Sequence, residues 1–391
     1  MVKYARTTEN KLKFDFDKPI DRRGTASIKW DKYKGRDVIP LWVADMDFAC
    51  APAVVEALHR RVDHPIYGYS DPPPELAGTV AAYLQREYGW KVEPDWLIWL
   101  PGLVVGLNVV CRAFGEADDD VVTATPVYHP FLSAPVNSRR NVIRVPMSEQ
   151  NGIWRWDIAA LERAITAKSR LLLLCNPHNP VGRVFTREEL RAIGEVCERH
   201  DLMLCSDEIH CELILDPDKP HIPIAAIGEN LAHRTVTLMS ASKTFNLPAL
   251  GCAFAIASNA QVRAKIRKAM AGIVHHVGMM GYIATLAAYS QGKEWRLSLL
   301  DYLRGNRDLV EREIGRIPAL RICHAEATYL SWIDARSLPI NNAQQFLEEA
   351  GAGLYDGAVF GAPGFLRLNF ACPRSLLKQA LERISAALAY L

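Results

Sequence analysis

The chain has 391 residues, of which 49% are hydrophobic, and its 46 basic and 44 acidic side chains leave a formal net charge of +2. This hydrophobic fraction excludes a disordered chain, and the balanced charge gives no electrostatic reason to expect nucleic acid or an anionic membrane as a partner. At about 150 residues per domain, the length predicts two or three domains. No apolar run approaches the roughly 20 residues that span a bilayer.

Two further features bear on the compartment in which the protein works. The first 18 residues are polar and contain no apolar signal-peptide core. The nine cysteines are odd in number, scattered, and free of Cys-x-x-Cys pairs. This usage is typical of buried reduced thiols rather than of disulfides or zinc ligands. We therefore expect a cytoplasmic protein without a metal site.

The first two-thirds of the chain alternates short apolar runs with longer amphipathic ones. Residues 186–200 form one such amphipathic pattern, with apolar side chains on one helical face. Strand–helix alternation predicts an α/β fold with a mostly parallel central sheet, because parallel strands buried on both faces are almost continuously apolar. The predicted strands are 121–125, 141–145, 171–175, 202–206, 235–239 and 252–257.

The pattern changes after residue 257. Residues 259–314 are helical in character, and they are followed by strand-like segments at 328–334 and 365–371 and by a helix from about Pro373. This change predicts two domains of different kind. We expect a large domain over residues 46–285 and a smaller α+β domain over residues 286–391. An N-terminal arm of residues 1–45 is expected to join the smaller domain.

Chemically distinctive residues follow three of the predicted strands. In an open parallel sheet, ligands bind at the carboxyl ends of the strands. Asn179 follows the strand 171–175, Asp207 follows 202–206, and Lys243 follows 235–239. Taken singly, they read as a turn residue, a helix cap and a loop lysine. Together they match pyridoxal phosphate, which needs a Schiff-base lysine, a carboxylate at the pyridinium nitrogen and a donor at the ring hydroxyl.

At these residues the sequence resembles the fold-type-I pyridoxal-phosphate enzymes of the aminotransferase superfamily. More narrowly, it resembles the MalY/PatB group of cystathionine β-lyases, which are cysteine-S-conjugate β-lyases. The resemblance covers nearly the whole chain and implies a large cofactor domain with a mostly parallel sheet and a smaller α+β domain. The motifs that carry it are DRRGTASIKWD (21–31), PLWVADMDF (40–48), YGY (67–69), PGLVVGLN (101–108), CNPHNPVGR (175–183), SDEIH (206–210), SASKTFN (240–246) and FLRLNFACPR (365–374).

The resemblance implies roles for the residues at the cofactor ring. Lys243 is expected to be the Schiff-base lysine and the catalytic base, and Asp207 the partner of the pyridine nitrogen. Asn179 is expected to bind the ring hydroxyl, with His210 nearby. Tyr128 is expected to stack on the face of the ring.

It also implies how the cofactor phosphate and the substrate are held. The backbone amides of Leu103 and Val104, at a helix N-terminus, are expected to bind the phosphate. Further phosphate contacts are expected from Ser240 and Ser242 and, across a homodimer interface, from Tyr67 of the neighbouring subunit. Arg367 is expected to bind the α-carboxylate of the substrate through two parallel hydrogen bonds.

Three departures help to place the chain within the superfamily. Aminotransferases of this fold usually carry a phosphate-binding arginine where this chain has Gly251, and a tyrosine where it has His210. Both differences favour the lyase branch. The stretch Leu247-Pro248-Ala249 departs from the pattern of the lyases themselves, which predicts a local difference in the loop after the lysine.

These features predict β-elimination from a sulfur amino acid such as L-cystathionine, which yields a thiol, pyruvate and ammonia. Two alternatives remain open. The first is a pyridoxal-phosphate-dependent aminotransferase of the same fold, since one cofactor site supports several reactions. The second is a lyase with an added regulatory role through protein contact. We expect a small amino-acid substrate and a homodimer, with no nucleic-acid or membrane partner.

Overall fold

A seven-stranded sheet forms the centre of the protein in the computed structural model, which describes residues 14–389. Its strand order is β2-β10-β9-β8-β7-β3-β4. Only β10 runs antiparallel to its neighbours, so the predicted mostly parallel α/β fold is confirmed. The strands are β2 (Leu97–Leu100), β3 (Asp120–Thr125), β4 (Asn141–Pro146), β7 (Ser169–Cys175), β8 (Met203–Asp207), β9 (Thr235–Met239) and β10 (Ala253–Ile256).

Helices cover both faces of this sheet, which explains its apolar strands. Along β7, Leu171 and Leu173 pack into one hydrophobic cluster while Leu172 and Leu174 pack into another, because successive side chains point to opposite faces. All four are fully buried. The first cluster includes residues of α4 (Leu103–Ala113), α5 (Pro130–Asn137) and α9 (Ala260–Met270), and the second those of α6 (Ile158–Ala164), α7 (Arg187–Arg199) and α8 (Glu229–His233).

The start of α7 shows how local sequence sets a helix boundary. The Thr186 hydroxyl accepts a hydrogen bond from the Glu189 amide at 3.2 Å, and the Glu189 carboxylate accepts one from the Thr186 amide at 2.8 Å. This reciprocal capping satisfies amides that have no partner within the helix. Leu190 and Ile193 then face the sheet. The helix predicted over 186–200 is thus confirmed.

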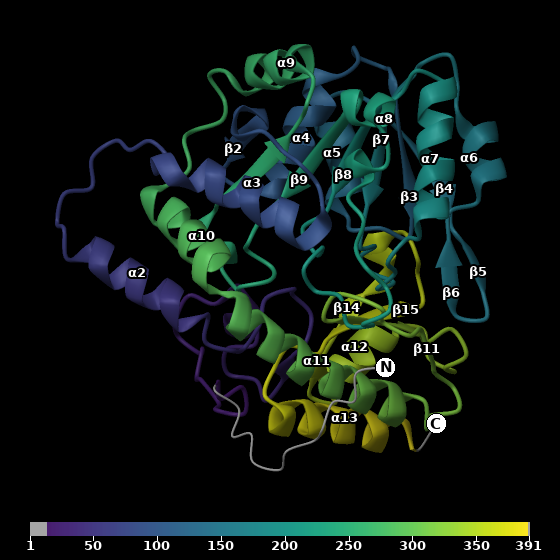
Figure 1. The fold of residues 1–391 in the computed structure, drawn as a ribbon. Coiled ribbons are helices and arrows are strands. Elements are labelled where there is room, and N and C mark those ends of the chain that lie inside the picture. The colour runs from purple at the N-terminus through teal and green to yellow at the C-terminus, as the bar shows by residue number, and fades with distance from the viewer. Residues whose placement is uncertain (1–13, 390–391) are drawn as a thin grey trace, which may run out of the picture.

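Three separate helices occupy the predicted helical region 259–314. They are α9, α10 (Met279–Gln291) and α11 (Lys293–Ile314). At the junction of α10 and α11, a Cβ on Gly292 would lie 2.4 Å from the Phe245 ring, so only glycine fits there. In Figure 1, α10 lies beside α2 (Pro52–Val62) and α3 (Pro74–Tyr88), and the structure also contains the short helices α1 (Ile28–Asp31) and α12 (Ala343–Glu349).

The C-terminal part forms a second, antiparallel sheet in the order β11-β12-β15-β14, with α13 (Arg374–Leu388) against α11 in the lower part of Figure 1. The N-terminal segment joins this part, because β1 (Ile39–Pro40) pairs with β13 (Ala352–Gly353). Residues 1–13 of the expected N-terminal arm lie outside the described residues. The other strands are β5 (Ser148–Gln150), β6 (Ile153–Arg155), β11 (Arg321–Ile322), β12 (Leu330–Asp334), β14 (Tyr355–Asp356) and β15 (Phe365–Asn369).

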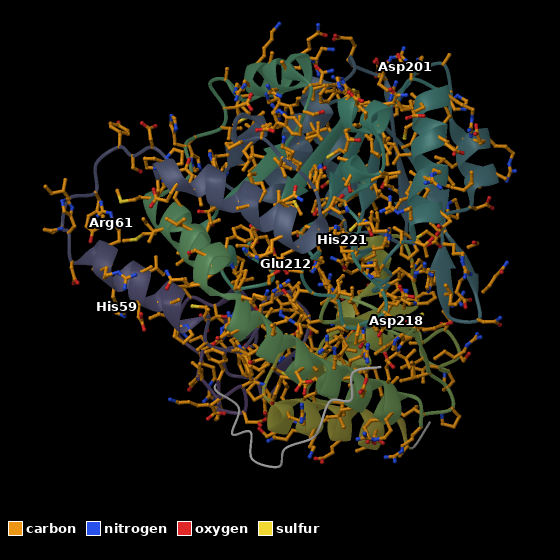
Figure 2. All side chains as sticks on the ribbon, viewed as in Figure 1. His59, Arg61, Asp201, Glu212, Asp218 and His221 are labelled. Carbon is orange, nitrogen blue, oxygen red and sulfur yellow. The ribbon has the colours of Figure 1, made fainter. Side chains whose placement is uncertain are left out.

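The loop that follows β8 carries buried polar side chains through the interior. Glu208 accepts hydrogen bonds from the Ser206 hydroxyl at 2.9 Å and the Ile224 amide at 3.2 Å, and it contacts His221 Nε2 at 2.8 Å. Figure 2 shows Glu212 and His221 from this loop in the middle of the molecule. The nine cysteines are free and all but Cys50 are buried, as predicted. Within residues 14–389, no helix is long and apolar enough to cross a membrane.

Candidate active site

Three neighbouring strands bring the predicted residues together. The strands β7, β8 and β9 lie side by side, and Asp207 at the end of β8 is in register with Cys175 on β7 and Leu238 on β9. Their carboxyl ends therefore open at one edge of the sheet. There, Asn179, Asp207 and Lys243 line one cavity of about 280 Å³, which we call the central cavity.

The central cavity contains ten of the eleven residues predicted for the site. Tyr67 is the exception. The ten are Leu103, Val104, Tyr128, Asn179, Asp207, His210, Ser240, Ser242, Lys243 and Arg367. The lining residues that sequence reasoning did not assign to the site include Val43, Ala44, His129 and Tyr355.

The cavity lies at the point in the sheet where the next strands of the chain lie on one side of β7 and the preceding strands β3 and β4 lie on the other. From β7 the sheet continues through β8 and β9 on one side, whereas β3 and β4 lie on the other. Tyr128 follows β3, and its amide donates to the Asn179 carbonyl at 3.1 Å, so the loops after β3 and β7 meet. This reversal point is where open α/β sheets bind ligands.

One end of the cavity is suited to an anion. The helix α4 begins at Leu103 after Gly102, and the first amides of a helix, here those of Leu103 and Val104, have no partner within it. Such amides and the helix dipole favour negative charge. The hydroxyls of Ser240 and Ser242, 2.9 Å apart at the end of β9, line the same cavity.

The Asp207 carboxyl is buried at the centre of the site. It accepts a hydrogen bond from the Ile209 amide at 3.1 Å. Burial raises the pKa of Asp207 to about 7, partly offset by that hydrogen bond. A cationic group placed against this carboxyl would lower its pKa again, since opposite charges favour the ionised form. Asp207 is therefore suited to binding a protonated ring nitrogen.

The Lys243 side chain also lines the central cavity. Its Nζ donates to the Ala44 carbonyl at 2.6 Å. Burial, followed by the positive charge of Arg367, lowers the pKa of Lys243 to about 8, while Asp45 and Asp207 act in the opposite direction. A substantial fraction of this amine is therefore neutral near pH 8. A neutral amine is the nucleophilic form that condenses with a carbonyl group.

Arg367, on β15, supplies a guanidinium that is only 2% exposed. Its Nη1 donates to Asn179 Oδ1 at 3.1 Å and its Nη2 to the Trp42 carbonyl at 2.8 Å. Burial lowers the pKa of Arg367 to about 10, and its Nε has no partner among the described residues. The Tyr355 ring lies 5.1 Å from the guanidinium. This planar donor can bind a carboxylate through two hydrogen bonds.

The His210 imidazole is uncharged in this environment. Burial, together with the charges of Lys243 and Arg367, lowers the pKa of His210 to about 3. Its Nδ1 is buried without a hydrogen-bond partner among the described residues. Buried polar atoms are normally paired, so this nitrogen is available to a polar group bound in the cavity.

Tyr67 lies outside the cavity of its own chain. It belongs to the segment between α2 and α3, which projects at the left of Figure 1. Its side chain is 60% exposed, and its hydroxyl donates to the Val62 carbonyl at 3.2 Å. The neighbouring side chains of Ile66 and Tyr69 are also exposed. The role predicted for Tyr67 across a subunit interface stays a prediction.

The loop after Lys243 has a backbone conformation that favours glycine at position 251. Pro248–Leu250 form a short 3₁₀ turn, and Gly251 follows with a φ of 54°. A Cβ at Gly251 would lie 3.0 Å from the Pro101 carbonyl. A positive φ and this close approach both favour glycine. The arginine that aminotransferases carry at this position would therefore need a shift of the loop.

A segment without regular structure closes the cavity. We call residues 42–48 the strap. Its backbone carbonyls, at Trp42 and Ala44, accept hydrogen bonds from Arg367 and Lys243. The sequence did not predict this role, because every residue type has a backbone carbonyl that can accept a hydrogen bond. The motif PLWVADMDF was the one available indication of its importance.

Comparisons with known proteins agree with this geometry. The family model for class I and II aminotransferases matches residues 36–384. Cystathionine beta-lyase PatB of Bacillus subtilis is 36% identical, over 96% of this chain and 100% of that protein. The crystal structure of OvoB superimposes with a TM-score of 0.94 at 42% identity, over 96% and 99% of the two chains. Cystalysin from Treponema denticola, whose structure contains pyridoxal 5'-phosphate, superimposes with a TM-score of 0.93 at 33% identity, over 97% and 100%.

Proposed function

Because the chain belongs to the class I and II aminotransferase family, and within it to the group of PatB and related cystathionine β-lyases, we propose that it is a carbon–sulfur lyase that depends on pyridoxal phosphate. The reaction is β-elimination from a sulfur amino acid such as L-cystathionine, with release of a thiol, pyruvate and ammonia. The single observation that carries the proposal is that one cavity contains an amine of lowered pKa, a buried carboxyl and a buried guanidinium.

The residues present fit pyridoxal phosphate on their own chemistry. The α4 N-terminus and two serine hydroxyls can receive its phosphate, the Asp207 carboxyl its ring nitrogen, and the unpaired Nδ1 of His210 a polar substituent of the ring. When bound, the cofactor supplies an electron-accepting ring that stabilises negative charge at the substrate Cα.

We assign the chain's own groups as follows. Lys243 Nζ would hold the cofactor covalently, and its free amine would take the proton from the substrate Cα. Asp207 would keep the ring nitrogen protonated, Asn179 would donate to the ring hydroxyl, and Tyr128 would stack on the ring face. Asn179, Asp207 and Arg367 are buried where they line the cavity, and low polarity around them strengthens these electrostatic contacts.

The phosphate and the substrate take the two ends of the cavity. The amides of Leu103 and Val104, with the hydroxyls of Ser240 and Ser242, would hold the phosphate. Arg367 binds the α-carboxylate of the substrate and thereby fixes the orientation of the Cα–H bond toward Lys243. Orientation of this kind lowers the barrier without new chemistry.

The protein is further proposed to be a cytoplasmic homodimer, in which Tyr67 reaches the phosphate of the neighbouring subunit. The exposed Tyr67, Ile66 and Tyr69 support an interface at the segment between α2 and α3, and the nine free cysteines support a reducing compartment. The proposed division into a large domain (46–285), a small domain (286–391) and an N-terminal arm (1–45) is supported by the pairing of β1 with β13.

The deciding experiment is release of pyruvate from L-cystathionine by the purified protein with added pyridoxal phosphate. We expect pyruvate and free thiol in equal amounts, and an absorbance band from the lysine–cofactor imine. The Lys243→Ala protein should show neither the band nor turnover. An imine band with amino transfer to an added keto acid, but without pyruvate, would instead make the protein an aminotransferase.

A further inference from the structure

The Ala44 carbonyl, which accepts a hydrogen bond from Lys243, also accepts one from a second side chain. The Ala44 carbonyl accepts hydrogen bonds both from Lys243 Nζ at 2.6 Å and from the Tyr329 hydroxyl at 3.0 Å. It belongs to a tight turn in the strap, in which the Asp45 amide donates to the Val43 carbonyl at 3.0 Å. The orientation of this one peptide group therefore decides where the free Lys243 amine lies.

A buried asparagine of the small domain holds that turn. Asn369 Nδ2 donates to the Val43 carbonyl at 2.6 Å and to the Asp45 carbonyl at 2.7 Å, which are the carbonyls on either side of Ala44. Asn369 Oδ1 accepts from the Ala371 amide at 2.8 Å, so the amide group is fixed at both ends. The Ala44 peptide group cannot rotate without breaking contacts of Asn369.

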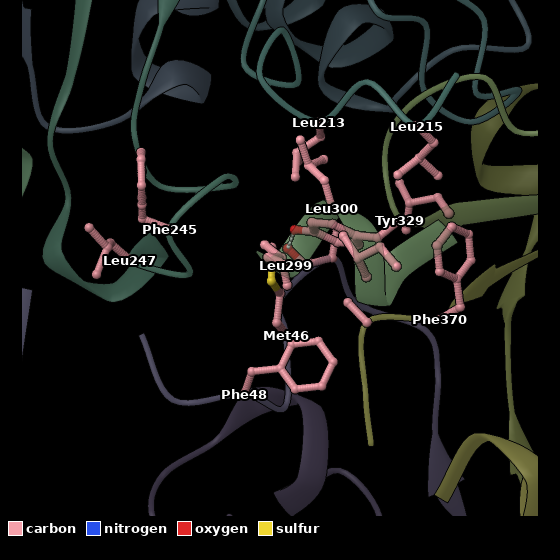
Figure 3. Packing of buried hydrophobic residues seen from close by; sticks show 14 of the residues in the cluster. Met46, Phe48, Leu213, Leu215, Phe245, Leu247, Leu299, Leu300, Tyr329 and Phe370 are labelled. Atoms are coloured by element: carbon pink, nitrogen blue, oxygen red, sulfur yellow. Dashed lines mark hydrogen bonds between the residues drawn. The ribbon is translucent and has the colours of Figure 1, made fainter. Parts of the chain in front are cut away.

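Other contacts hold the remainder of the strap. Asn246, three residues after Lys243, accepts from the Met46 amide and donates to the carbonyls of Met46 and Phe48, all at 2.9–3.0 Å. Figure 3 shows Met46 and Phe48 packed in a hydrophobic cluster with Tyr329. Tyr329, at the Ala44 carbonyl, and Lys29, whose Nζ donates to the Asp45 carbonyl at 3.2 Å, also contact the turn, but Asn369 is bonded to the carbonyls on both sides of Ala44.

We propose that Asn369 is a positioning residue for Lys243, and that it acts through the Val43–Asp45 turn to keep the Ala44 carbonyl within hydrogen-bond distance of the lysine amine. The proposal rests on the role assigned to Lys243 in the proposed function. It adds a link between the two domains, because Asn369 and Arg367 share β15 whereas Lys243 follows β9. Through its carbonyls at Ala44 and Trp42, the strap contacts both the Lys243 amine and the Arg367 guanidinium and so holds them near each other.

The charged groups that face Lys243 set the direction of the expected effect. Arg367 lowers the pKa of Lys243, and Asp45 and Asp207 raise it, with burial as the largest cause of the lowering. A carbonyl acceptor at 2.6 Å stabilises the ammonium form. If the turn moves away, this acceptor is lost and the pKa of Lys243 falls, while the Asp45 carboxylate stays paired with Arg22 at 2.7 Å and Lys29 at 3.6 Å.

The test is the variant Asn369→Leu, which keeps the size of the side chain but removes its donor. The full chain, freed of cofactor, is treated with trinitrobenzenesulfonate across a range of pH, and modification of Lys243 is followed by mass spectrometry of its peptide. We expect the pH midpoint to fall by about half a unit or more, the size that follows from losing one hydrogen bond. Asn369→Ala provides a second variant if the leucine protein does not fold.

Asn306 offers a matched control. It is fully buried, and its Nδ2 donates to the carbonyls of Phe370 and Cys372, each at 2.9 Å, so it bridges two carbonyls as Asn369 does. Asn306→Leu should lower the unfolding temperature but leave the Lys243 midpoint unchanged. An equal shift in both variants, or a shift in neither, would overturn the proposal. Because the assay does not use turnover, its result is independent of which reaction the enzyme catalyses.

Discussion

Arg367 Nη1 donates a hydrogen bond to Asn179 Oδ1 at 3.1 Å, across 188 residues of chain. This contact joins the group that is proposed to bind the substrate carboxylate to the group that is proposed to bind the cofactor ring. A substrate held by Arg367 is therefore placed in a fixed relation to the cofactor. The two contacts of the guanidinium, with Asn179 and Trp42, require its planar shape as well as its charge.

The first prediction concerns this geometry. Arg367→Lys keeps the positive charge but cannot reproduce the paired donors, so we expect kcat/KM for L-cystathionine to fall about 10- to 150-fold, which corresponds to about 1.5–3 kcal/mol. The imine absorbance of the cofactor-loaded variant should remain, because Lys243 is intact. An unchanged kcat/KM would remove Arg367 from the substrate site.

The second prediction tests the shared site. If Tyr67 serves the neighbouring subunit, a hybrid dimer of a Tyr67→Ala chain and a Lys243→Ala chain contains one complete site, with Lys243 from the first chain and Tyr67 from the second. Co-expression with two different affinity tags allows isolation of the hybrid. We expect it to regain about half of the wild-type turnover, because one of two sites is complete. If Tyr67 instead served its own subunit, the hybrid would show no recovery over the Tyr67→Ala protein.

The third prediction is a pH dependence of stability. Glu212 is 4% exposed, and burial raises its pKa to about 7, with Arg296 acting in the opposite direction. The folded protein therefore binds this proton more tightly than the unfolded chain, whose value is near 4.5. The stabilisation from this group is complete at pH values below 4.5, is lost as the pH rises toward 7, and stays constant above 7.

The variant Glu212→Gln removes this dependence. We expect its free energy of unfolding, relative to the wild type, to rise by about 1–3 kcal/mol between pH 5 and pH 8. Urea unfolding at the two pH values measures the difference. Glu382→Gln, at an exposed position on α13, is the control and should show no such change. The same pH slope in wild type and Glu212→Gln would contradict the raised pKa.

The fourth prediction concerns the ion pairs that Asp47 of the strap forms with Arg22 and Lys29. The Asp47 carboxylate is buried and contacts Lys29 Nζ at 2.7 Å, Arg22 Nη1 at 2.7 Å and the Trp30 indole at 2.8 Å. Asp47→Asn leaves Lys29, itself fully buried, without its nearest counter-charge. Only the more distant Asp45 carboxylate, at 3.6 Å, then remains near the buried ammonium, and because breaking a buried ion pair is strongly unfavourable, we expect a loss of about 3 kcal/mol in the free energy of unfolding.

The control for this prediction uses the same chemistry at the surface. Asp21 pairs with Arg23 at 2.8 Å, but both side chains are exposed. Ion pairs in water contribute little to stability. Asp21→Asn should therefore leave the urea midpoint unchanged, and equal effects of the two variants would show that the ion pairs of Asp47 are no stronger than a surface pair.

The predictable parts of the fold and site were those with a local pattern. The strand 171–175 is a continuous apolar run. Asp207 comes directly after one such run and Lys243 four residues after another, so periodicity and strand-end reasoning located them. The strand β2 was missed, and the opposite direction of β10 was not foreseen, because a four-residue edge strand has too few residues to show a period and strand direction has no local pattern.

The parts that the sequence did not predict depend on the backbone or on distant pairing. Ala44 contributes only its backbone carbonyl, and because every residue type has one, the sequence gives no sign of this role. Tyr355 lies on a two-residue strand whose partner, β15, is ten residues further along the chain. Asn369 was visible within FLRLNFACPR, but its contact with the Val43–Asp45 turn forms only when the N-terminal segment folds back onto β15.

The pairing of β15 has a consequence for how this family of chains can change in length. Arg367 is in register with Trp332 on β12 and with Tyr355 on β14, and Asn369 lies two positions further on the same side of the strand. Inserting or deleting a single residue within β15 would turn at least one of these two side chains to the opposite face of the sheet. Changes of length among relatives should therefore accumulate in surface loops, whereas β15 keeps a constant number of residues from Phe365 to Asn369.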